Sequence, residues 1–296
     1  MAEILQKDGT WAFDGDALRL TPGRDKGVSL LRGTLGELVV PLEALAGISF
    51  ERGRRAGRLR LRLRDGVDPL LLATGGRLAE PHDPYRLVVE PDRYGVAEYL
   101  VDEVRTALTL DRVPADPVDA YLLPGPAVPL SVAAGDGKVS FDGERVQLEW
   151  NWKAEEAKTS VGTRTLALAD VVGVEWWPSM RLQNGFLRFT VRGAPAKVPP
   201  KYDPNAVELW GFRKDPLMAL VAAAVQARLP HPAAAVRAEP APLVAAAPSP
   251  ALAPTPADGD HDVLLRRLRE LGELHRTGVL TDEEFTRAKQ AVLDRM

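Results

Sequence analysis

The chain contains an internal duplication, which constrains its fold more than any other feature. The segment Asp-Gly-Thr-Trp-Ala-Phe-Asp-Gly at residues 8–15 recurs as Asp-Gly-Lys-Val-Ser-Phe-Asp-Gly at residues 136–143, with five of eight positions identical. Similarity continues downstream, where residues 57–63 match residues 185–191. With 296 residues, the chain has room for about two domains and a smaller piece. The sequence therefore predicts one domain present twice, followed by a tail.

Each copy has the pattern of a β-rich domain that ends in a helix. Short runs of alternating apolar and polar residues, separated by Gly, Pro and Asp, are typical of strands, and Asp-Gly between two runs favours a hairpin turn. In the second copy, Asp215-Pro216 predicts the start of the closing helix, with Asp215 as its N-cap. In the first copy we expect strands at 10–13, 17–21, 37–41, 46–52, 58–64, 68–73 and 85–90, and then a helix over 92–110.

Six or seven short strands closed by one helix, in about 100 residues, predict a mainly β fold with some α structure. We expect a small β-sandwich or partly open barrel, in which the C-terminal helix covers one open corner. This order of elements resembles the pleckstrin-homology-like (PH-like) superfold. The predicted repeats cover residues 1–110 and 130–229, and a proline-rich spacer at 111–129 joins them.

The last part of the chain changes in composition. Nineteen of the thirty-one residues at 230–260 are Ala or Pro, which predicts a disordered linker with too few large apolar groups to form a core. Residues 261–296 return to a helical pattern and predict a hairpin of two helices, too small to be stable without a partner. Its apolar stripe, a candidate association surface, consists of Leu264, Leu268, Leu271, Leu274, Phe285 and Leu293.

The tail and the repeats each resemble a known family. The segment Leu-Arg-Glu-Leu-Gly-Glu-Leu-His-Arg-Thr-Gly-Val-Leu-Thr-Asp-Glu-Glu-Phe at 268–285 closely resembles the short C-terminal domain called SHOCT. That resemblance implies association rather than catalysis. Residues 1–229, through the repeated Phe-Asp-Gly signature, resemble a bacterial family of unknown function in which two β-rich repeats precede a SHOCT tail. This second resemblance implies an architecture and no activity.

A cluster of arginines is the most conspicuous charged feature. On a strand over 58–64, the arginines would share one face and the leucines between them the other. Guanidinium groups suit oxyanions, so the cluster is a candidate site for phosphate, a lipid head group or an acidic partner. The alternative is the solvated outer face of a half-buried strand. This arginine ridge consists of Arg52, Arg54, Arg55, Arg58, Arg60, Arg62 and Arg64.

Tryptophans gather in the second copy. Trp150, Trp152 and Trp177 are candidates for an aromatic surface that binds a ligand or a partner. Trp176 aligns with Phe50 of the first copy and is expected in the core. For Trp150 and Trp152 a core position is the alternative, whereas Trp177 has the opposite strand parity to Trp176 and is expected to be exposed.

Composition and motifs argue against several other functions. The chain has no cysteine, only four scattered histidines and no recognisable nucleophile elbow or phosphate-binding loop, so we expect no catalytic residues, no metal site and no cofactor. Asp14 and Asp142 recur before glycine, which fits turn formation. A formal net charge of −3 does not favour nucleic-acid binding. The N-terminus does not have the pattern of a signal peptide, and we expect a cytoplasmic location.

Two functions from different classes remain. The first is a non-enzymatic adaptor or scaffold, with protein-binding repeats and a tethered hairpin that associates with itself or with a partner. The second is a module that binds anionic lipid or a phosphorylated ligand through the arginine ridge. The PH-like resemblance implies lipid binding through basic residues around the first hairpin. That turn is here the acidic Phe-Asp-Gly at residues 13–15, so membrane binding is less favoured.

Overall fold

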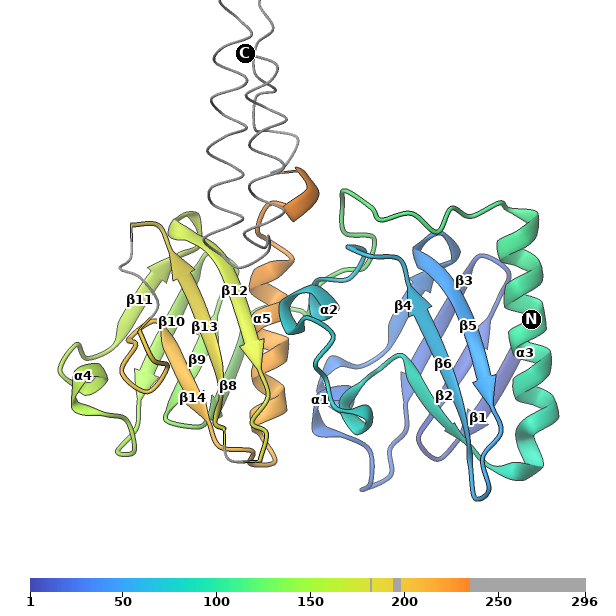
Figure 1. Cartoon of the computed structure of the whole chain (residues 1–296), viewed down its shortest axis with the longest axis horizontal. Coiled ribbons are helices and arrows are strands. Elements are labelled where there is room, and N and C mark those ends of the chain that lie inside the picture. The colour runs from blue at the N-terminus through green and yellow to red at the C-terminus, as the bar shows by residue number, and fades with distance from the viewer. Residues whose placement is uncertain (182, 194–197, 235–296) are drawn as a thin grey trace, which may run out of the picture. The chain divides into compact units, whose positions relative to one another are not determined.

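The computed structural model describes residues 1–181, 183–193 and 198–234, and Figure 1 shows that they form two β-rich repeats. Repeat 1 contains β1 (Ala2–Gln6), β2 (Gly9–Phe13), β3 (Ala17–Pro22), α1 (Leu30–Leu35), β4 (Leu38–Pro41), β5 (Leu45–Glu51), β6 (Gly57–Leu63), α2 (Pro69–Thr74), β7 (Arg86–Val89) and α3 (Tyr94–Leu110). Repeat 2 contains β8 (Leu130–Ala134), β9 (Gly137–Phe141), β10 (Arg145–Trp150), α4 (Glu156–Thr159), β11 (Arg164–Ala167), β12 (Val171–Trp177), β13 (Gly185–Val191), β14 (Ala206–Leu209) and α5 (Met218–Gln226). Short 3-10 helices cover Leu42–Ala44, Glu80–His82, Pro91–Arg93, Leu168–Asp170 and Asp215–Leu217.

Each repeat is built from two small antiparallel sheets. In repeat 1 the sheets have the orders β1-β2-β3-β4 and β5-β6-β7, and in repeat 2 the orders β11-β10-β9-β8 and β12-β13-β14. In β6 the apolar residues alternate inward, so that Leu59, Leu61 and Leu63 are buried. Within the described residues no sheet closes into a barrel. The prediction of a mainly β fold with some α structure is therefore confirmed, whereas the PH-like resemblance stays a prediction.

The Asp-Gly turns form as the sequence predicts. Asp14 Oδ1 accepts the backbone N–H of Asp16 at 3.1 Å and that of Ala17 at 2.9 Å, between β2 and β3. In repeat 2, Asp142 Oδ1 accepts two N–H groups in the same way. These backbone hydrogen bonds lower the pKa of both carboxyls. The interpretation of the two aspartates as turn formers is thus confirmed.

The terminal helix of each repeat packs across the two sheets. In repeat 1, α3 lies against β1 and β5 and buries one apolar stripe that includes Leu100 and Val104. In repeat 2, α5 packs on β8, β9 and β12. This helix is buried on all sides, and not only along the stripe that the sequence indicates. A helix that is apolar all round needs a second partner.

That second partner is α2 of repeat 1, which the sequence analysis assigned to a strand over residues 68–73. The expected strand is wrong because Asp68 accepts the N–H groups of Leu70 and Leu71, and Pro69 occupies the first turn, which together start a helix. Helix α2 packs on α5, and Leu70 belongs to the hydrophobic core of repeat 2 (Figure 1). The two repeats therefore share a core.

The expected start of the closing helix at Asp215 also needs correction. Asp215 begins a 3-10 helix whose N-cap is Lys214, and α5 follows from Met218. The Oδ2 atom of Asp215 instead accepts the backbone N–H groups of Trp210, Gly211 and Phe212, at 2.8, 2.7 and 3.1 Å. The Asp215 carboxylate thus holds the loop that precedes the helix, because three consecutive backbone N–H groups of that loop donate to one of its oxygens.

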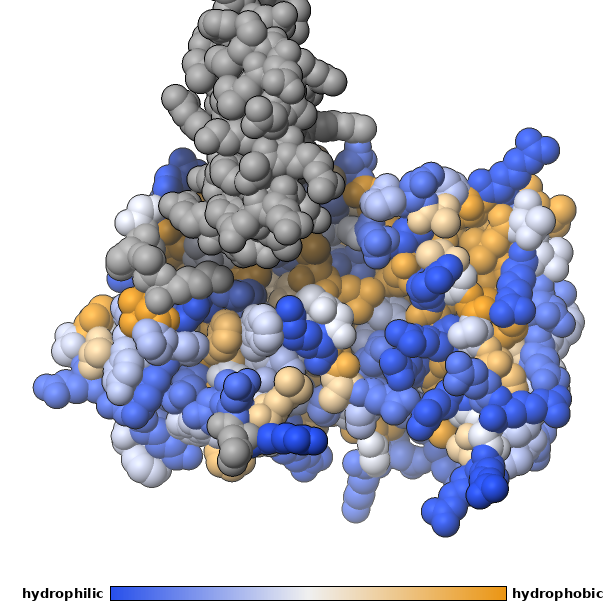
Figure 2. Space-filling view, in the orientation of Figure 1, coloured by the Kyte–Doolittle hydropathy of each residue, from blue (hydrophilic) through white to orange (hydrophobic). Residues whose placement is uncertain are grey.

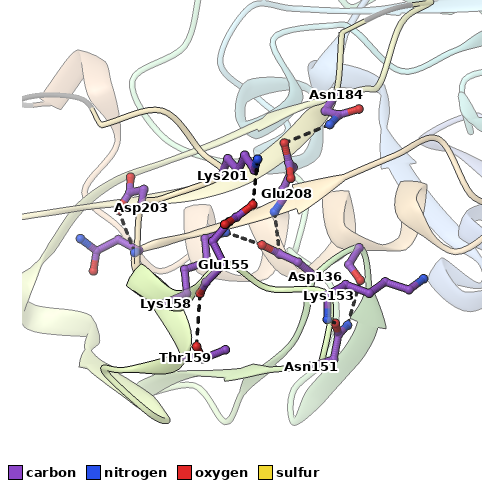
Figure 3. A network of polar contacts seen from close by, with 12 residues as sticks. Asp136, Asn151, Lys153, Glu155, Lys158, Thr159, Asn184, Lys201, Asp203 and Glu208 are labelled. Carbon is purple, nitrogen blue, oxygen red and sulfur yellow. Dashed lines mark hydrogen bonds and ion pairs between the residues drawn. The ribbon is translucent and has the colours of Figure 1, made fainter.

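The first aspartate of the repeated motif joins the two sheets of its repeat. In repeat 2, Asp136 Oδ2 lies 2.5 Å from Lys158 Nζ of α4, and both side chains are buried. Asp136 Oδ1 accepts the N–H of Glu208 in β14 at 2.8 Å (Figure 3). In repeat 1, Asp8 pairs with Arg32 of α1 at 2.7 Å, and its carboxylate faces the N–H of Val88 in β7. The duplication thus preserves an aspartate–cation pair that anchors an edge strand.

Candidate anion-binding groove

A groove lies on the outer face of the sheet β5-β6-β7 in repeat 1. It has a volume of about 850 Å³. Arg58 and Arg60 of β6 line it from the side of the sheet opposite the core, because residues along a strand alternate between faces. Hydrophilic side chains gather over β5 and β6 in Figure 2. We call this cavity the arginine groove.

Four of the seven arginines in the predicted ridge have partners within the protein. Arg52 donates two hydrogen bonds of 2.8 Å to Glu98 of α3, and Arg58 lies 3.3 Å from Glu80. Arg62 donates to the carbonyl of Ala46, and Arg64 donates to the carbonyls of Glu43 and Asp116. Arg62 and Arg64 also lie outside the groove. The ridge is therefore not one continuous binding surface.

The other three arginines line the groove and have no such partner. Arg54, Arg55 and Arg60 are exposed, and none makes an ion pair, a hydrogen bond or a ring contact with another described residue. Arg54 and Arg55 belong to the loop between β5 and β6, whereas Arg60 lies on β6 between Ser49 and Arg86. Three unpaired guanidinium groups around one cavity are suited to binding oxyanions.

Contacts with α3 hold the loop that carries Arg54 and Arg55. The hydroxyl of Tyr94 donates to the carbonyl of Gly53 at 2.9 Å, and the Tyr94 ring packs edge-on against Phe50 at 5.2 Å between centroids. The Arg52–Glu98 pair ties the same loop to the helix. Less conformational entropy is lost on binding when the binding groups are anchored in advance.

In repeat 2, the arginine equivalent to Arg60 is paired with a carboxylate instead of free. Arg188 of β13 matches Arg60 in the repeat alignment, but it is buried and lies 3.0 Å from Asp203. The matching Asp83 of repeat 1 is bound instead by Arg86, at 2.9 Å. The second copy has Ala206 where the first has Arg86, so Asp203 is available to Arg188. Arg86 thereby leaves Arg60 unpaired.

Carboxylates also line the groove, although they are not among the site residues predicted from the sequence. Glu51 comes from β5, and Asp8 lies in the β1–β2 turn, paired with Arg32. Glu80 binds both Arg58 and Arg86. Strand register could have indicated Glu51, which pairs with Arg58 across β5 and β6. Glu80 comes from the 3-10 helix Glu80–His82, which no local pattern places at the groove. The groove therefore combines unpaired positive charge with fixed negative charge.

The structure places the three predicted tryptophans in different surroundings. Trp150 is half-buried against the core, with Lys158 Nζ 5.0 Å from its ring. Trp152 is 88% exposed. Trp177 is 38% exposed, stacks on Phe186, and has the guanidinium of Arg77 at 3.8 Å from its ring centre. Trp176 is buried, as expected.

The predicted association stripe, Leu264, Leu268, Leu271, Leu274, Phe285 and Leu293, lies outside the described residues. Along the part of the chain that the structure does describe, no helix has the length and apolar character needed to cross a membrane.

Comparisons with known families agree with the duplicated architecture. A domain of unknown function, DUF4429, matches residues 11–105 and again residues 139–226. This chain belongs to the DUF4429 family. The two matched segments of DUF4429 correspond to repeat 1 and repeat 2, and a short C-terminal domain (SHOCT) matches residues 266–293. The family and tail indicated by the sequence are thereby confirmed. A search of curated proteins found no match to the chain.

Proposed function

We propose that this DUF4429 protein is a non-enzymatic adaptor whose arginine groove binds an acidic segment of a partner protein. The observation that carries the proposal is the set of three unpaired arginines, Arg54, Arg55 and Arg60, around one cavity of about 850 Å³. Carboxylates of a bound segment would accept charge-assisted hydrogen bonds from these guanidinium groups, which are stronger than neutral ones.

The charge distribution in the groove favours a protein segment over a membrane surface. Asp8, Glu51 and Glu80 lie among the arginines. Asp8 and Glu80 are paired with arginines, so Glu51 is the carboxylate that a surface rich in anionic lipid would meet, and like charges repel at such distances. A peptide can place acidic residues beside the arginines and neutral or basic residues beside the carboxylates.

The proposal is tested by fluorescence anisotropy with a labelled acidic peptide that alternates Glu and Gly, added to the full-length protein. Arg60→Ala should weaken binding about tenfold or more, because a hydrogen bond to a charged group contributes about 1.5–3 kcal/mol. The combined Arg54→Ala and Arg55→Ala variant should weaken it further. Arg62→Ala is the matched control, since Arg62 lies on the same strand face but outside the groove.

Equal affinity of the wild-type protein and the Arg60→Ala variant for the peptide would refute the groove as the binding site. Flotation with phosphatidylglycerol vesicles distinguishes the lipid alternative. If vesicles bind through Arg54 and Arg55 while the peptide does not bind, the ligand is lipid rather than protein.

The match of residues 266–293 to SHOCT favours a second role, self-association through the tail. Full-length Leu271→Asp should then have a lower mass in light scattering than the wild-type protein, because a charge on the apolar stripe costs desolvation energy. Glu273→Gln, at a polar position of the same segment, serves as the control. An unchanged mass for Leu271→Asp contradicts self-association without affecting the groove proposal.

A further inference from the structure

Three aromatic rings of repeat 2 surround one ammonium group. Lys153 Nζ lies 5.3 Å from the ring centre of Trp152, 5.1 Å from that of Trp210 and 5.5 Å from that of Phe212. Trp210 and Phe212 contact each other edge-on, at 77° between their planes. Trp152 and Phe212 are exposed, at 88% and 58%. We call these three rings and Lys153 the aromatic cluster.

Two loops that are distant in the sequence supply the cluster, one after β10 and one after β14. Hydrogen bonds to Asp136 fix the chain just before each loop. Asn151 donates its backbone N–H to the carbonyl of Asp136, and its side chain accepts the N–H of Lys153 at 2.9 Å. Asp136 also accepts the N–H of Glu208, just before the loop that Asp215 shapes around Trp210 and Phe212. In Figure 3, Lys153 extends away from the Asp136–Lys158 pair.

The ring distances suit a cation that is larger than a bare ammonium. Carbon atoms in van der Waals contact are about 3.5–4.0 Å apart. A C–N bond adds about 1.5 Å. A methyl carbon on a nitrogen at the position of Lys153 Nζ would therefore just reach the rings at the observed distances of 5.1–5.5 Å. Aromatic faces attract such cations, and cages of aromatic rings recognise quaternary ammonium groups.

We propose that the aromatic cluster is a binding site for a small, water-soluble alkylated ammonium ion, and that the Lys153 side chain occupies this site in the free protein. The ligand displaces the Lys153 ammonium and places its N-methyl groups against Trp152, Trp210 and Phe212. Lys153 is thus an internal competitor, which sets the ligand concentration at which the site fills. The site is independent of the arginine groove, because it lies in repeat 2 and binds a cation.

The test is saturation-transfer NMR on the methyl protons of tetramethylammonium chloride, titrated into the full-length protein. Saturable binding is expected, with a dissociation constant about threefold to tenfold lower for Lys153→Ala, because the variant removes the competing ammonium. Phe212→Ala and Trp152→Ala should weaken binding by a similar factor. Both residues are exposed, and circular dichroism checks that each variant folds. Trp177→Ala, a second exposed tryptophan with a cation over its ring, should bind like the wild-type protein.

Three results would overturn the proposal. The first is no saturable binding to the wild-type protein or to Lys153→Ala, and the second is binding that Phe212→Ala leaves unchanged. The third is cosedimentation with phosphatidylcholine vesicles that requires Phe212, without binding of the free ion, which would assign the site to a lipid head group. Ammonium chloride at equal concentration should not compete, since it has the charge without the methyl groups.

Discussion

At the scale of single residues, the repeated motif places one aspartate–cation pair in each copy. In repeat 2, burial raises the pKa of the Asp136 carboxyl, whereas the charge of Lys158 and the hydrogen bonds that the carboxylate accepts act in the opposite direction. The side chains of Lys158 and Asp136 are 0% and 2% exposed, compared with 6% and 26% for Arg32 and Asp8. Because desolvated charges depend most on their partners, the pair in repeat 2 should be the more sensitive to mutation.

We predict that Lys158→Ala lowers the free energy of unfolding by about 3–5 kcal/mol, because it leaves Asp136 buried without its cation. Urea unfolding of the full chain provides the measurement. Lys138→Ala is the matched control, because Lys138 also pairs with a carboxylate, Glu149, but at the exposed surface. It should cost at most about 1 kcal/mol. If Lys158→Ala costs no more than the control, the pair does not stabilise the repeat.

The hairpin turns predict a pH dependence. In the folded protein, backbone N–H groups lower the pKa of Asp14 and Asp142, so the folded state binds fewer protons there than the unfolded state. Their contribution to stability is present above the unfolded pKa of about 3.9 and is lost as the pH falls through the lower folded values. Asparagine can accept the same hydrogen bonds without titrating.

The variant with both Asp14→Asn and Asp142→Asn should therefore lose less thermal stability between pH 6 and pH 3 than the wild-type protein. Thermal unfolding followed by circular dichroism at the two pH values measures the difference. Identical losses would show that the two turns do not contribute to acid sensitivity.

At the scale of elements, the short helix α2 connects the two repeats. It packs on α5 of repeat 2, which is why α5 has no exposed face. Asp68 fixes the start of α2 and also accepts a hydrogen bond of 2.7 Å from the hydroxyl of Tyr85. The N-cap and this buried contact hold the helix at the position where Leu70 enters the core of repeat 2.

We predict that Leu70→Ala lowers the free energy of unfolding by about 2–5 kcal/mol, the usual cost of a cavity in a core. Leu72→Ala, two residues further along the same helix, is the control, because Leu72 is exposed. It should change stability by about 0.5 kcal/mol or less. Chemical denaturation measures the free energy of unfolding of both variants. Equal losses of stability would contradict a shared core at α2.

At the scale of the whole molecule, the common core joins the folding of the two repeats. Further contacts cross the same boundary: His231, after α5, lies 3.0 Å from the carbonyl of Gly66, and Gln226 donates to the hydroxyl of Tyr121 in the spacer. Buried contacts between two structural units make their unfolding cooperative, since separating the units would expose apolar surface on both.

The two repeats should therefore unfold in a single transition. Trp11 is the only tryptophan of repeat 1, so in a Trp11→Phe variant fluorescence reports on repeat 2 alone, whereas circular dichroism follows both repeats. The two signals should coincide in that variant and separate when Leu70→Asp is added. Separate transitions without the Leu70 substitution would refute coupling between the repeats.

Features that depend on local pattern could be predicted from the amino-acid sequence alone. Duplication, strand periodicity and the Asp14 and Asp142 turns are all contained within short segments, because side-chain alternation and turn chemistry depend on near neighbours. The separation of arginines from leucines on β6 follows from the same alternation. The helix of residues 92–110 was likewise predictable from its apolar spacing, and the structure has it at Tyr94–Leu110.

Which of these side chains are paired and which are free depends on the folded protein. Arg58 and Arg60 are equivalent in the sequence pattern, yet Glu80 neutralises the first and Arg86 keeps Asp83 from the second. Trp152 and Phe212 are sixty positions apart in the chain, yet both rings lie beside the ammonium group of Lys153. The helical conformation of α2 follows from local sequence, because Asp68 and Pro69 start a helix. Its packing on α5 depends on residues far away in the chain. Ion pairs and packing depend on distances in space between residues far apart in sequence, and these exist only once the chain has folded.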